Sequence, residues 1–221
     1  MVGHGVLPWY SDFAEYTQSS WHLHLKPGPA PVPGLAAFVA IINLGGAIMS
    51  DQTAIATLLA RQEIADVIYR YARGIDRMDF ELVRACYHAD AYDDHGSMKG
   101  TVDEFIAAAS TFLQRWTATQ HFMGNMLIEV VGEHARAETY AVAYHRREDA
   151  DGNGKDDVMG VRYVDRFERR GGEWKIAHRV VASEWRRVEV VKGARGRGEL
   201  GVWGRRDESD VLNWIMSARA P

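Results

Sequence analysis

The sequence contains a single cysteine, Cys86, so an intrachain disulfide is excluded. Cys86 sits in a short helical pattern among apolar residues, where a thiol is more readily explained as a small core group than as a nucleophile. So sparse a use of cysteine fits a reducing compartment, and we expect a cytoplasmic protein.

Sequence motifs for several common chemistries are also absent. There is no glycine-rich phosphate loop, no zinc-ligand spacing and no Gly-x-Ser-x-Gly elbow. Residues 149–156 faintly resemble a calcium loop but lack its spaced glutamate, which favours a solvated hairpin tip. We therefore expect neither a metal nor another cofactor.

Charge of one sign is not in large excess, since the net charge is −4 at pH 7 and the pI is about 6.1. Neither nucleic acid nor an anionic membrane surface is therefore expected as a partner. The apolar run at residues 35–48 is shorter than the roughly 20 residues that span a bilayer, so no membrane segment is expected either.

Prolines are rare except in the first 48 residues, which hold five of the six. Met49 stands directly before the first regular pattern. We expect residues 1–48 to be a disordered arm or a mis-assigned upstream extension, and residues 49–191 to form one domain. Residues 192–221 form a predicted tail with an apolar patch. We expect this tail to fold over the cavity mouth or a neighbouring subunit, with a mobile tail as the alternative.

Apolar residues recur three or four positions apart from Asp51 onward, which predicts an amphipathic helix. Gly74 is expected to end this helix, because glycine adopts the left-handed conformation at little cost. Asp76 would then lie just past the helix, and Asp79 would cap a second, short helix over residues 80–87. A third helix is predicted over residues 101–116.

The second half of the chain has the alternating pattern of strands. An irregular strand with a turn is expected at residues 91–100, and long strands are predicted at residues 120–131, 135–147, 157–169 and 173–188. Glycine-containing turns typical of hairpins join the long strands, which predicts an antiparallel meander. The expected fold is therefore α+β, a cone-shaped curved antiparallel sheet covered by three N-terminal helices.

Alternation along each strand assigns the side chains to two faces of the sheet. One face mixes small, apolar and a few polar residues, which suits a concave pocket for a mainly apolar small molecule. That pocket face is assigned to His121, Met123, Asn125, Leu127, Ala141, Ala143, His145, Val158, Gly160, Arg162, Val181, Ser183 and Trp185. The opposite face is assigned to Tyr140, Val142, Tyr144, Tyr163, Phe167, Trp174, Ile176 and Val180. It is too apolar to be left wet, so we expect a homodimer or homotrimer through this outer sheet face.

Four stretches of the sequence carry a family resemblance. They are Tyr71-Ala-Arg-Gly-Ile-Asp76, Thr119-Gln-His-Phe-Met-Gly-Asn125, Tyr144-His-Arg146, and the strand pair from Arg162 to Arg179 with its Asp-Arg-Phe-Glu-Arg-Arg-Gly-Gly-Glu-Trp segment. Together they resemble the SnoaL-like members of the nuclear transport factor 2-like superfamily, over roughly residues 51–188. The resemblance implies a cone-shaped α+β barrel with a helix-lidded cavity, and does not by itself imply an enzyme.

A dehydratase branch of this family uses a tyrosine and an aspartate near the end of the first helix, with a histidine on the following long strand. A dehydrochlorinase branch uses the same pair of aspartate and histidine. Tyr71, Asp76 and His121 match these positions, so the resemblance implies that they are catalytic. His145 resembles a second histidine that some members carry on the adjacent strand. The branch that dehydrates bile acids has an acidic residue where this chain has Ala143, so its substrate does not transfer.

The chemistry of such a trio follows from the residue types. An imidazole can act as a general base while a buried carboxylate holds its other nitrogen, and a tyrosine hydroxyl can donate to a carbonyl or to a leaving hydroxyl. The candidates for substrate binding are His95, Asn125, His145, Arg162 and Trp185. Alternatives remain, since Asp76 and His95 can equally form turns and Arg162 can equally form a structural ion pair.

Two classes of function fit the sequence. The first is a cofactor-independent lyase or isomerase, a dehydratase above all, for an apolar cyclic molecule such as a steroid, terpenoid or polyketide. The second is a non-catalytic member that binds a ligand or a partner, for example a small subunit of a ring-hydroxylating dioxygenase. The concurrence of Tyr71, Asp76 and His121 favours the first, because a binding pocket does not need an acid, a base and an orienting group together.

Overall fold

The computed structural model describes residues 51–149, 153–192 and 201–217. Contacts divide the chain between Ile48 and Met49, and every described residue belongs to the second part. The prediction for residues 1–48 therefore falls outside the described residues. In the described ranges, no helix is both long enough and apolar enough to cross a lipid bilayer.

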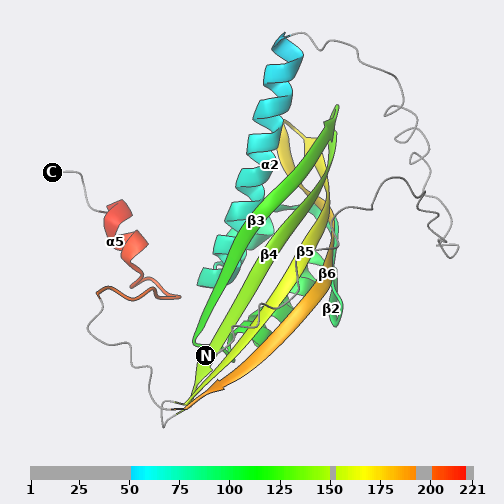
Figure 1. The fold of residues 1–221 in the computed structure, drawn as a ribbon. Helices are drawn as coiled ribbons and strands as arrows, with labels where there is room; N and C mark the ends of the chain where they lie inside the picture. Colours follow the sequence, from blue (N-terminus) through cyan, green and yellow to red (C-terminus); the bar gives the residue numbers. More distant parts are fainter. Residues whose placement is uncertain (1–50, 150–152, 193–200, 218–221) are drawn as a thin grey trace, which may run out of the picture. The chain divides into compact units, whose positions relative to one another are not determined.

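The described elements follow the predicted order of two helices, an irregular strand with a turn, a third helix and four long strands, and α5 near the C-terminal end is an additional helix (Figure 1). The helices are α2 (Asp51–Arg77), α3 (Phe80–Ala85), α4 (Val102–Leu113) and α5 (Val211–Ser217). The strands are β1 (Tyr87–His95), β2 (Met98–Thr101), β3 (Ala118–Val131), β4 (His134–Glu148), β5 (Gly154–Arg170) and β6 (Glu173–Val191).

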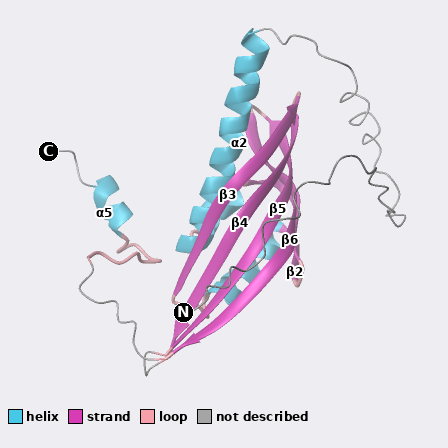
Figure 2. Ribbon diagram, in the orientation of Figure 1, coloured by secondary structure: helices cyan, strands magenta, loops and turns pink. Residues whose placement is uncertain are grey.

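The strands form one curved sheet in the order β2-β1-β6-β5-β4-β3, and α2 runs alongside it (Figure 2). Strands β3 to β6 pair in the predicted antiparallel meander. The pairing of β1 with β6 is parallel and was not predicted. The core lies between the helices and one face of the sheet, where Ile68 and Phe105 pack in one cluster with Phe167 and Ile176. The predicted α+β fold, a curved sheet covered by helices, is confirmed.

The end of α2 differs from the prediction. The helix begins at Asp51 as expected but continues through Gly74 to Arg77, so Asp76 lies in its last turn and not beyond it. The left-handed stop is Met78, with a φ of 56°, and the amide of Asp79 donates to the Gly74 carbonyl at 2.9 Å. This is the bond pattern of a Schellman cap.

Gly74 serves close packing. A Cβ at this position would lie 2.7 Å from Cγ2 of Val83, on α3. Glycine is therefore needed for the approach of the two helices and not for the end of α2.

The short helix α3 has the predicted cap but ends earlier than predicted. Asp79 caps α3 as predicted, accepting from the amide of Leu82 at 3.0 Å. However, α3 ends at Ala85 and the chain is already in β1 from Tyr87 onward, earlier than predicted. Cys86 is buried at this junction, and burial raises the pKa of its thiol, as befits a core residue.

A bulge reverses the two faces of β3 halfway along. His121 and Met123 lie on the helix side as predicted, but the register with β4 shifts between Met123 and Met126. Asn125, within the shift, and Leu127, beyond it, lie on the exposed side. The prediction that all four share a face is wrong, because one extra residue in a strand exchanges its faces.

The predicted faces of β5 are also wrong. Ala143 on β4 pairs with Met159 on β5, which puts Met159, Val161 and Tyr163 on the helix side. Arg162 therefore points outward with Gly160. Four residues assigned to the outer face are instead buried in the core: Tyr163, Phe167, Trp174 and Ile176. The register of β5 with β4 sets these faces, and alternation within a single strand does not reveal that register.

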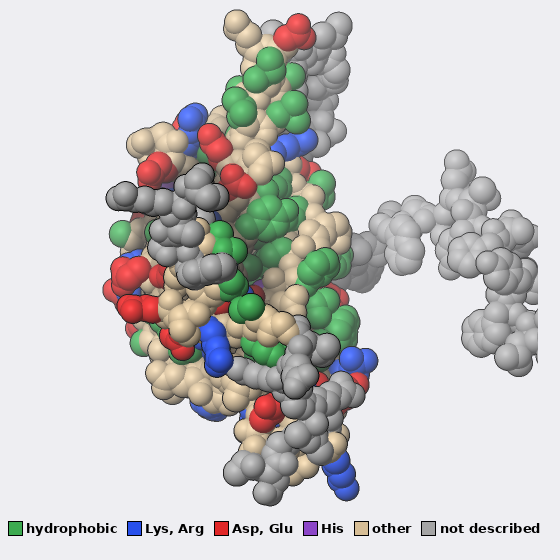
Figure 3. Space-filling view, turned by 90° about the vertical axis from the view of Figure 1, so that its left-hand side faces the viewer, with side chains coloured by type: hydrophobic (Ala, Val, Ile, Leu, Met, Phe, Trp, Pro, Cys, Tyr) green, Lys and Arg blue, Asp and Glu red, His purple; other side chains and the backbone are tan. Residues whose placement is uncertain are grey.

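The outer face nevertheless keeps a contiguous apolar patch. Phe122, Tyr140, Val142 and Trp185 line one shallow depression, and Phe122 is 65% exposed. A second group of exposed apolar side chains, Ile55, Leu58 and Leu59, belongs to the first turns of α2. Figure 3 shows hydrophobic side chains gathered along this projecting helix end and on the surface below it.

The C-terminal segment 201–217 contacts the helix ends. Arg206 Nη1 donates to the carbonyl oxygens of Leu113 and Trp116 at 3.1 and 2.6 Å, and Arg77 pairs with Asp210 at 3.6 Å. These contacts link the segment to the ends of α2 and α4. The role predicted for the whole tail stays a prediction.

Candidate active site

A cavity of about 180 Å³ opens between the helices and the pocket face of the sheet. Its walls are largely apolar and come from α4 and the long strands: Phe105, Ala109, Phe112, Leu113, Ala143, Met159, Val161 and Val181. Its polar groups are Tyr71, His95, His121, His145, Tyr163 and Ser183. An apolar enclosure with a few converging polar groups is typical of a small-molecule site.

Asp76 and His121 form a carboxylate–histidine dyad at one wall of this cavity. The last turn of α2 presents Asp76 to the start of β3, where Oδ1 accepts from His121 Nδ1 and Oδ2 accepts from the His121 backbone amide, both at 2.7 Å. Burial opposes the charge of Asp76, but the hydrogen bonds from His121 outweigh it and the pKa of the carboxyl is lowered. An ionised Asp76 thus holds the proton of His121 on Nδ1 and leaves Nε2 as the basic nitrogen.

His145 lies beside this dyad, and its pKa is lowered. Its ring centroid is 5.7 Å from that of His121, and it packs against Phe112 and Trp116. Burial, with the neighbouring His121 as a smaller cause, lowers the pKa of His145 to about 4. His145 is therefore a neutral imidazole near pH 7, which can bond to a ligand without adding charge.

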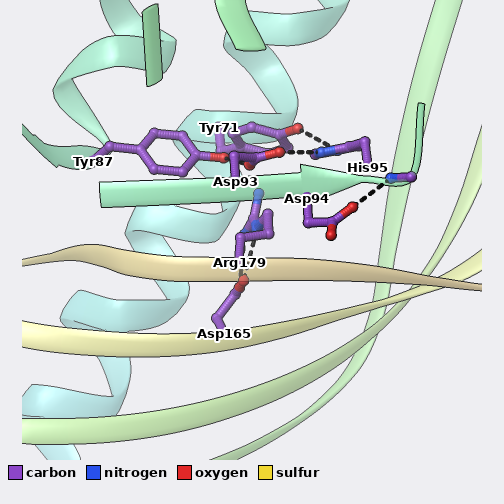
Figure 4. Close-up of polar contacts among 8 residues, drawn as sticks. Tyr71, Tyr87, Asp93, Asp94, His95, Asp165 and Arg179 are labelled. Atoms are coloured by element: carbon purple, nitrogen blue, oxygen red, sulfur yellow. Dashed lines mark hydrogen bonds and ion pairs between the residues drawn. The ribbon is translucent and has the colours of Figure 1, made fainter. Parts of the chain in front are cut away.

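A second carboxylate–histidine pair, Asp93 and His95, lies on β1 (Figure 4), and His95 lines the same cavity. His95 Nδ1 makes a short hydrogen bond with Oδ1 of Asp93, and His95 Nε2 lies 3.2 Å from the hydroxyl of Tyr71. The other oxygen of Asp93 accepts from the Tyr87 hydroxyl at 2.6 Å. His95 is held further by stacking on Phe105, with ring centroids 4.6 Å apart.

A buried ion pair lies directly beneath this pair. Arg179 donates Nε and Nη2 to the two oxygens of Asp165, each at 2.7 Å, and both side chains are fully buried. Strand pairing makes Arg179 the neighbour of Asp93 on one side and of Asp165 on the other. Its guanidinium also sits 4.1 Å from the Tyr71 ring centroid, in cation–π range.

The structure brings most of the predicted site residues together. Tyr71, His95, His121 and His145 line one cavity, and Asp76 supports His121 from behind. The other three predicted residues lie outside this cavity, in the exposed depression on the far face or beside it: Asn125, Arg162 and Trp185. Arg162 there forms ion pairs with Glu138 and Glu184 at 3.4 and 2.5 Å, the structural alternative.

Sequence reasoning missed Asp93, Tyr87 and the Arg179–Asp165 pair. The spacing of Asp93 and His95 two apart on a strand was a usable signal, because it places both on one face. The parallel pairing of β1 with β6, which aligns Asp93 with Arg179, had no such signal. Among the described residues, no group of three or more His, Cys, Asp or Glu is arranged to hold a metal ion.

The fold and the lined cavity define a member of the nuclear transport factor 2-like superfamily. A family model described as the SnoaL-like domain matches residues 56–180, more than half of the chain. The chain therefore belongs to the SnoaL-like family. A search of curated proteins gave no match.

Several solved structures share this fold. A scytalone dehydratase candidate from Novosphingobium aromaticivorans is 19% identical, with a TM-score of 0.55 over 67% of this chain and 99% of that one. A hexachlorocyclohexane dehydrochlorinase of type 2 is 15% identical, with a TM-score of 0.57 over 66% and 99%. A candidate aromatic ring hydroxylase from N. aromaticivorans is 18% identical, with a TM-score of 0.51 over 59% and 92%. At these identities the likeness concerns the fold alone.

Proposed function

We propose that this protein is a cofactor-independent lyase or isomerase, foremost a dehydratase, that acts on a small apolar cyclic molecule. The observation that carries the proposal is the pair of hydrogen bonds between Asp76 and His121 at the wall of an apolar cavity. Dehydratase and dehydrochlorinase proteins among the structures of the same fold support it.

The dyad supplies the base. With Nδ1–H held by Asp76, Nε2 of His121 removes a proton from a carbon next to a carbonyl, and the nearby carboxylate stabilises the imidazolium that forms. The hydroxyl of Tyr71 faces the same cavity as a donor. Either loss of a β-hydroxyl as water or return of the proton to another carbon completes the reaction, giving a lyase or an isomerase.

The size of the cavity narrows the substrate. A protein cavity of about 150 Å³ takes up benzene, so the space of about 180 Å³ here fits one substituted ring without movement of the walls. Among the cyclic molecules considered from the sequence, small monocyclic or bicyclic ketones are favoured over a whole steroid.

Exchange of carbon-bound protons tests the base without knowledge of the natural substrate. The probe is 2-tetralone in heavy water, with deuterium uptake at its α carbons followed by mass spectrometry. We expect exchange above the buffer rate, and a loss of roughly 100-fold or more in His121→Ala and in Asp76→Asn. His134→Ala, which removes an exposed histidine at a hairpin turn, is the matched control.

Two results would overturn the proposal. Equal exchange by the wild type and His121→Ala would remove His121 as the base. Binding of 2-tetralone, seen as a change in tryptophan fluorescence, without any exchange above buffer would favour the alternative function, a non-catalytic ligand-binding member of the family.

A further inference from the structure

We propose that Asp93 and His95 form a second proton-handling dyad, which resupplies the Tyr71 hydroxyl with a proton while Tyr71 protonates the leaving group. This inference rests on the proposed lyase function and gives the reaction an acid side opposite the His121 base. It is carried by the unbroken chain of contacts from Asp93 through His95 to the Tyr71 hydroxyl, at the wall of the cavity (Figure 4).

The charges of the buried cluster around Asp93 balance only with one more positive group beside Asp93. The described cluster holds two fully buried carboxylates, Asp93 and Asp165, and one guanidinium, Arg179. Arg179 gives both of its bonded nitrogens to Asp165. Among the described residues, the side-chain hydrogen bonds of Asp93 go to the neutral hydroxyl of Tyr87 and to the ring of His95. A cationic His95 brings the cluster to neutrality, and buried charge is costly unless it is paired.

Tyr71 needs such a partner to act as an acid. Its side chain is 1% exposed, and burial is the main reason that the pKa of its hydroxyl lies well above the usual value. Leaving Tyr71 as a tyrosinate would therefore be unfavourable. A proton passed from His95 Nε2 to the Tyr71 oxygen, as Tyr71 gives up its own, avoids that state altogether.

The protons and bonds balance for a dehydration. His121 takes the proton from the carbon, the electron pair of that C–H bond forms the C=C bond, and the β carbon–oxygen bond breaks. The leaving oxygen takes the proton of Tyr71 and departs as water, while the proton on His95 Nε2 moves to Tyr71. His121 ends protonated and His95 neutral, and exchange with solvent resets both. In this scheme Tyr71 contacts the leaving oxygen, whereas Asp93 and His95 orient the Tyr71 hydroxyl and return a proton to it.

The test compares two leaving groups on one ring. The probes are 3-hydroxycyclohexanone and 3-acetoxycyclohexanone, which both yield cyclohex-2-enone after removal of the same kind of α proton. Hydroxide needs protonation to leave, whereas acetate does not. In His95→Gln we expect kcat/KM to fall about 100-fold or more on the hydroxy probe and by less than about fivefold on the acetoxy probe.

A matched control and a double variant separate the relay from a structural role. His88→Gln changes a buried histidine on the same strand, whose Nε2 bonds to the Glu168 carbonyl at 2.8 Å, and should leave the ratio of the two rates unchanged. The double variant His95→Gln with Tyr71→Phe should be no slower on the hydroxy probe than the slower single variant, because both pass one proton. Asp93→Asn should repeat the His95→Gln pattern.

The outcomes also distinguish the two proposals. Equal losses on both probes in His95→Gln, or additive losses in the double variant, would overturn the relay while the His121 base stands. No turnover of either probe by the wild type would overturn the lyase function and the relay with it.

Discussion

Asp76 and His121 are joined at two points, since one carboxylate oxygen accepts from the ring and the other from the backbone amide of the same residue. Both donors need an acceptor. An asparagine has only one acceptor oxygen, and its NH2 group is a donor. If the NH2 faces the backbone N–H of His121, two donors repel each other. If the NH2 faces Nδ1, an unprotonated Nδ1 can accept from it. Asp76→Asn should therefore move the proton of neutral His121 from Nδ1 to Nε2.

Long-range proton–nitrogen NMR of histidine-labelled protein reads this tautomer directly. We expect the Nδ1–H form in the wild type and the Nε2–H form in Asp76→Asn. Asp66→Asn, on the same helix but bonded to Gln62, is the control and should leave His121 unchanged. An Nδ1–H tautomer that persists in Asp76→Asn would show that the carboxylate does not set the state of His121.

Gly74→Ala should destabilise the protein. In an exposed helix the change would be favourable by about 1 kcal/mol. Here the new Cβ would lie 2.7 Å from Val83 Cγ2 and 3.1 Å from the Asp79 carbonyl oxygen, and overpacking of this kind costs roughly 1–3 kcal/mol. The sign of the change in the free energy of unfolding, measured in urea, shows whether helix propensity or overpacking dominates. In Gly74→Ala with Val83→Ala, the loss should be smaller than the sum of the single losses.

The pKa of His145 predicts a loss of stability in mild acid. Its folded pKa of about 4 lies below the ordinary value of 6.5, so the unfolded chain binds the proton first as the pH falls. The free energy of unfolding is then undiminished above about pH 6.5 and declines toward pH 4, with a loss of roughly 2 kcal/mol between about pH 7 and pH 5.

Urea unfolding at the two pH values checks this dependence. In His145→Gln the loss on going to the lower pH should shrink by most of that amount, because the titrating group is gone. His134→Gln, which removes an exposed histidine, should behave like the wild type. Equal losses in the wild type and His145→Gln would show that other groups cause the acid sensitivity.

The sequence patterns that predicted the fold were those of local origin. The apolar spacing of α2, the Asp79 cap and the hairpin turns each depend on neighbouring residues, and each is found in the structure. Gly74 was misread because a glycine that allows close packing and one that ends a helix look alike in a sequence. Only the position of Val83, nine residues on, separates the two.

The candidate site was predictable where the family motif and the strand register agreed. The sequence predicted that Tyr71, Asp76 and His121 belong to one site. The first two lie on α2 and His121 precedes the bulge of β3, so the bulge does not affect their positions. Asn125 lies within that bulge, between Met123 and Met126, and Arg162 belongs to a strand whose faces depend on its register with β4. Asp93 required the parallel pairing of β1 with β6, a contact between residues more than eighty positions apart, which no local pattern encodes.

The outer sheet face should mediate self-association. Phe122, Tyr140, Val142 and Trp185 form an exposed apolar patch, and such patches commonly mark protein interfaces. Sedimentation velocity of the full chain should show a dimer or trimer, and Val142→Glu should reduce it to a monomer. Val131→Glu, at the far end of β3, is the control and should keep the assembly. A monomeric wild type would contradict the expectation.

Removal of one partner of the Arg179–Asp165 pair should destabilise the protein more than replacement of both partners by apolar residues. Asp165→Asn leaves the fully buried Arg179 without its counter-charge, and loss of one partner of a buried pair costs about 3–5 kcal/mol. Asp90→Asn, which breaks the exposed pair with Arg170, should change the urea midpoint far less. The double variant Arg179→Met with Asp165→Leu should recover most of the loss, because no unpaired charge remains and Asp93 keeps Tyr87 and His95. A double variant as unstable as Asp165→Asn would instead show that the guanidinium stabilises the fold through its contacts with the Tyr71 and Tyr163 rings, 4.1 and 4.5 Å away.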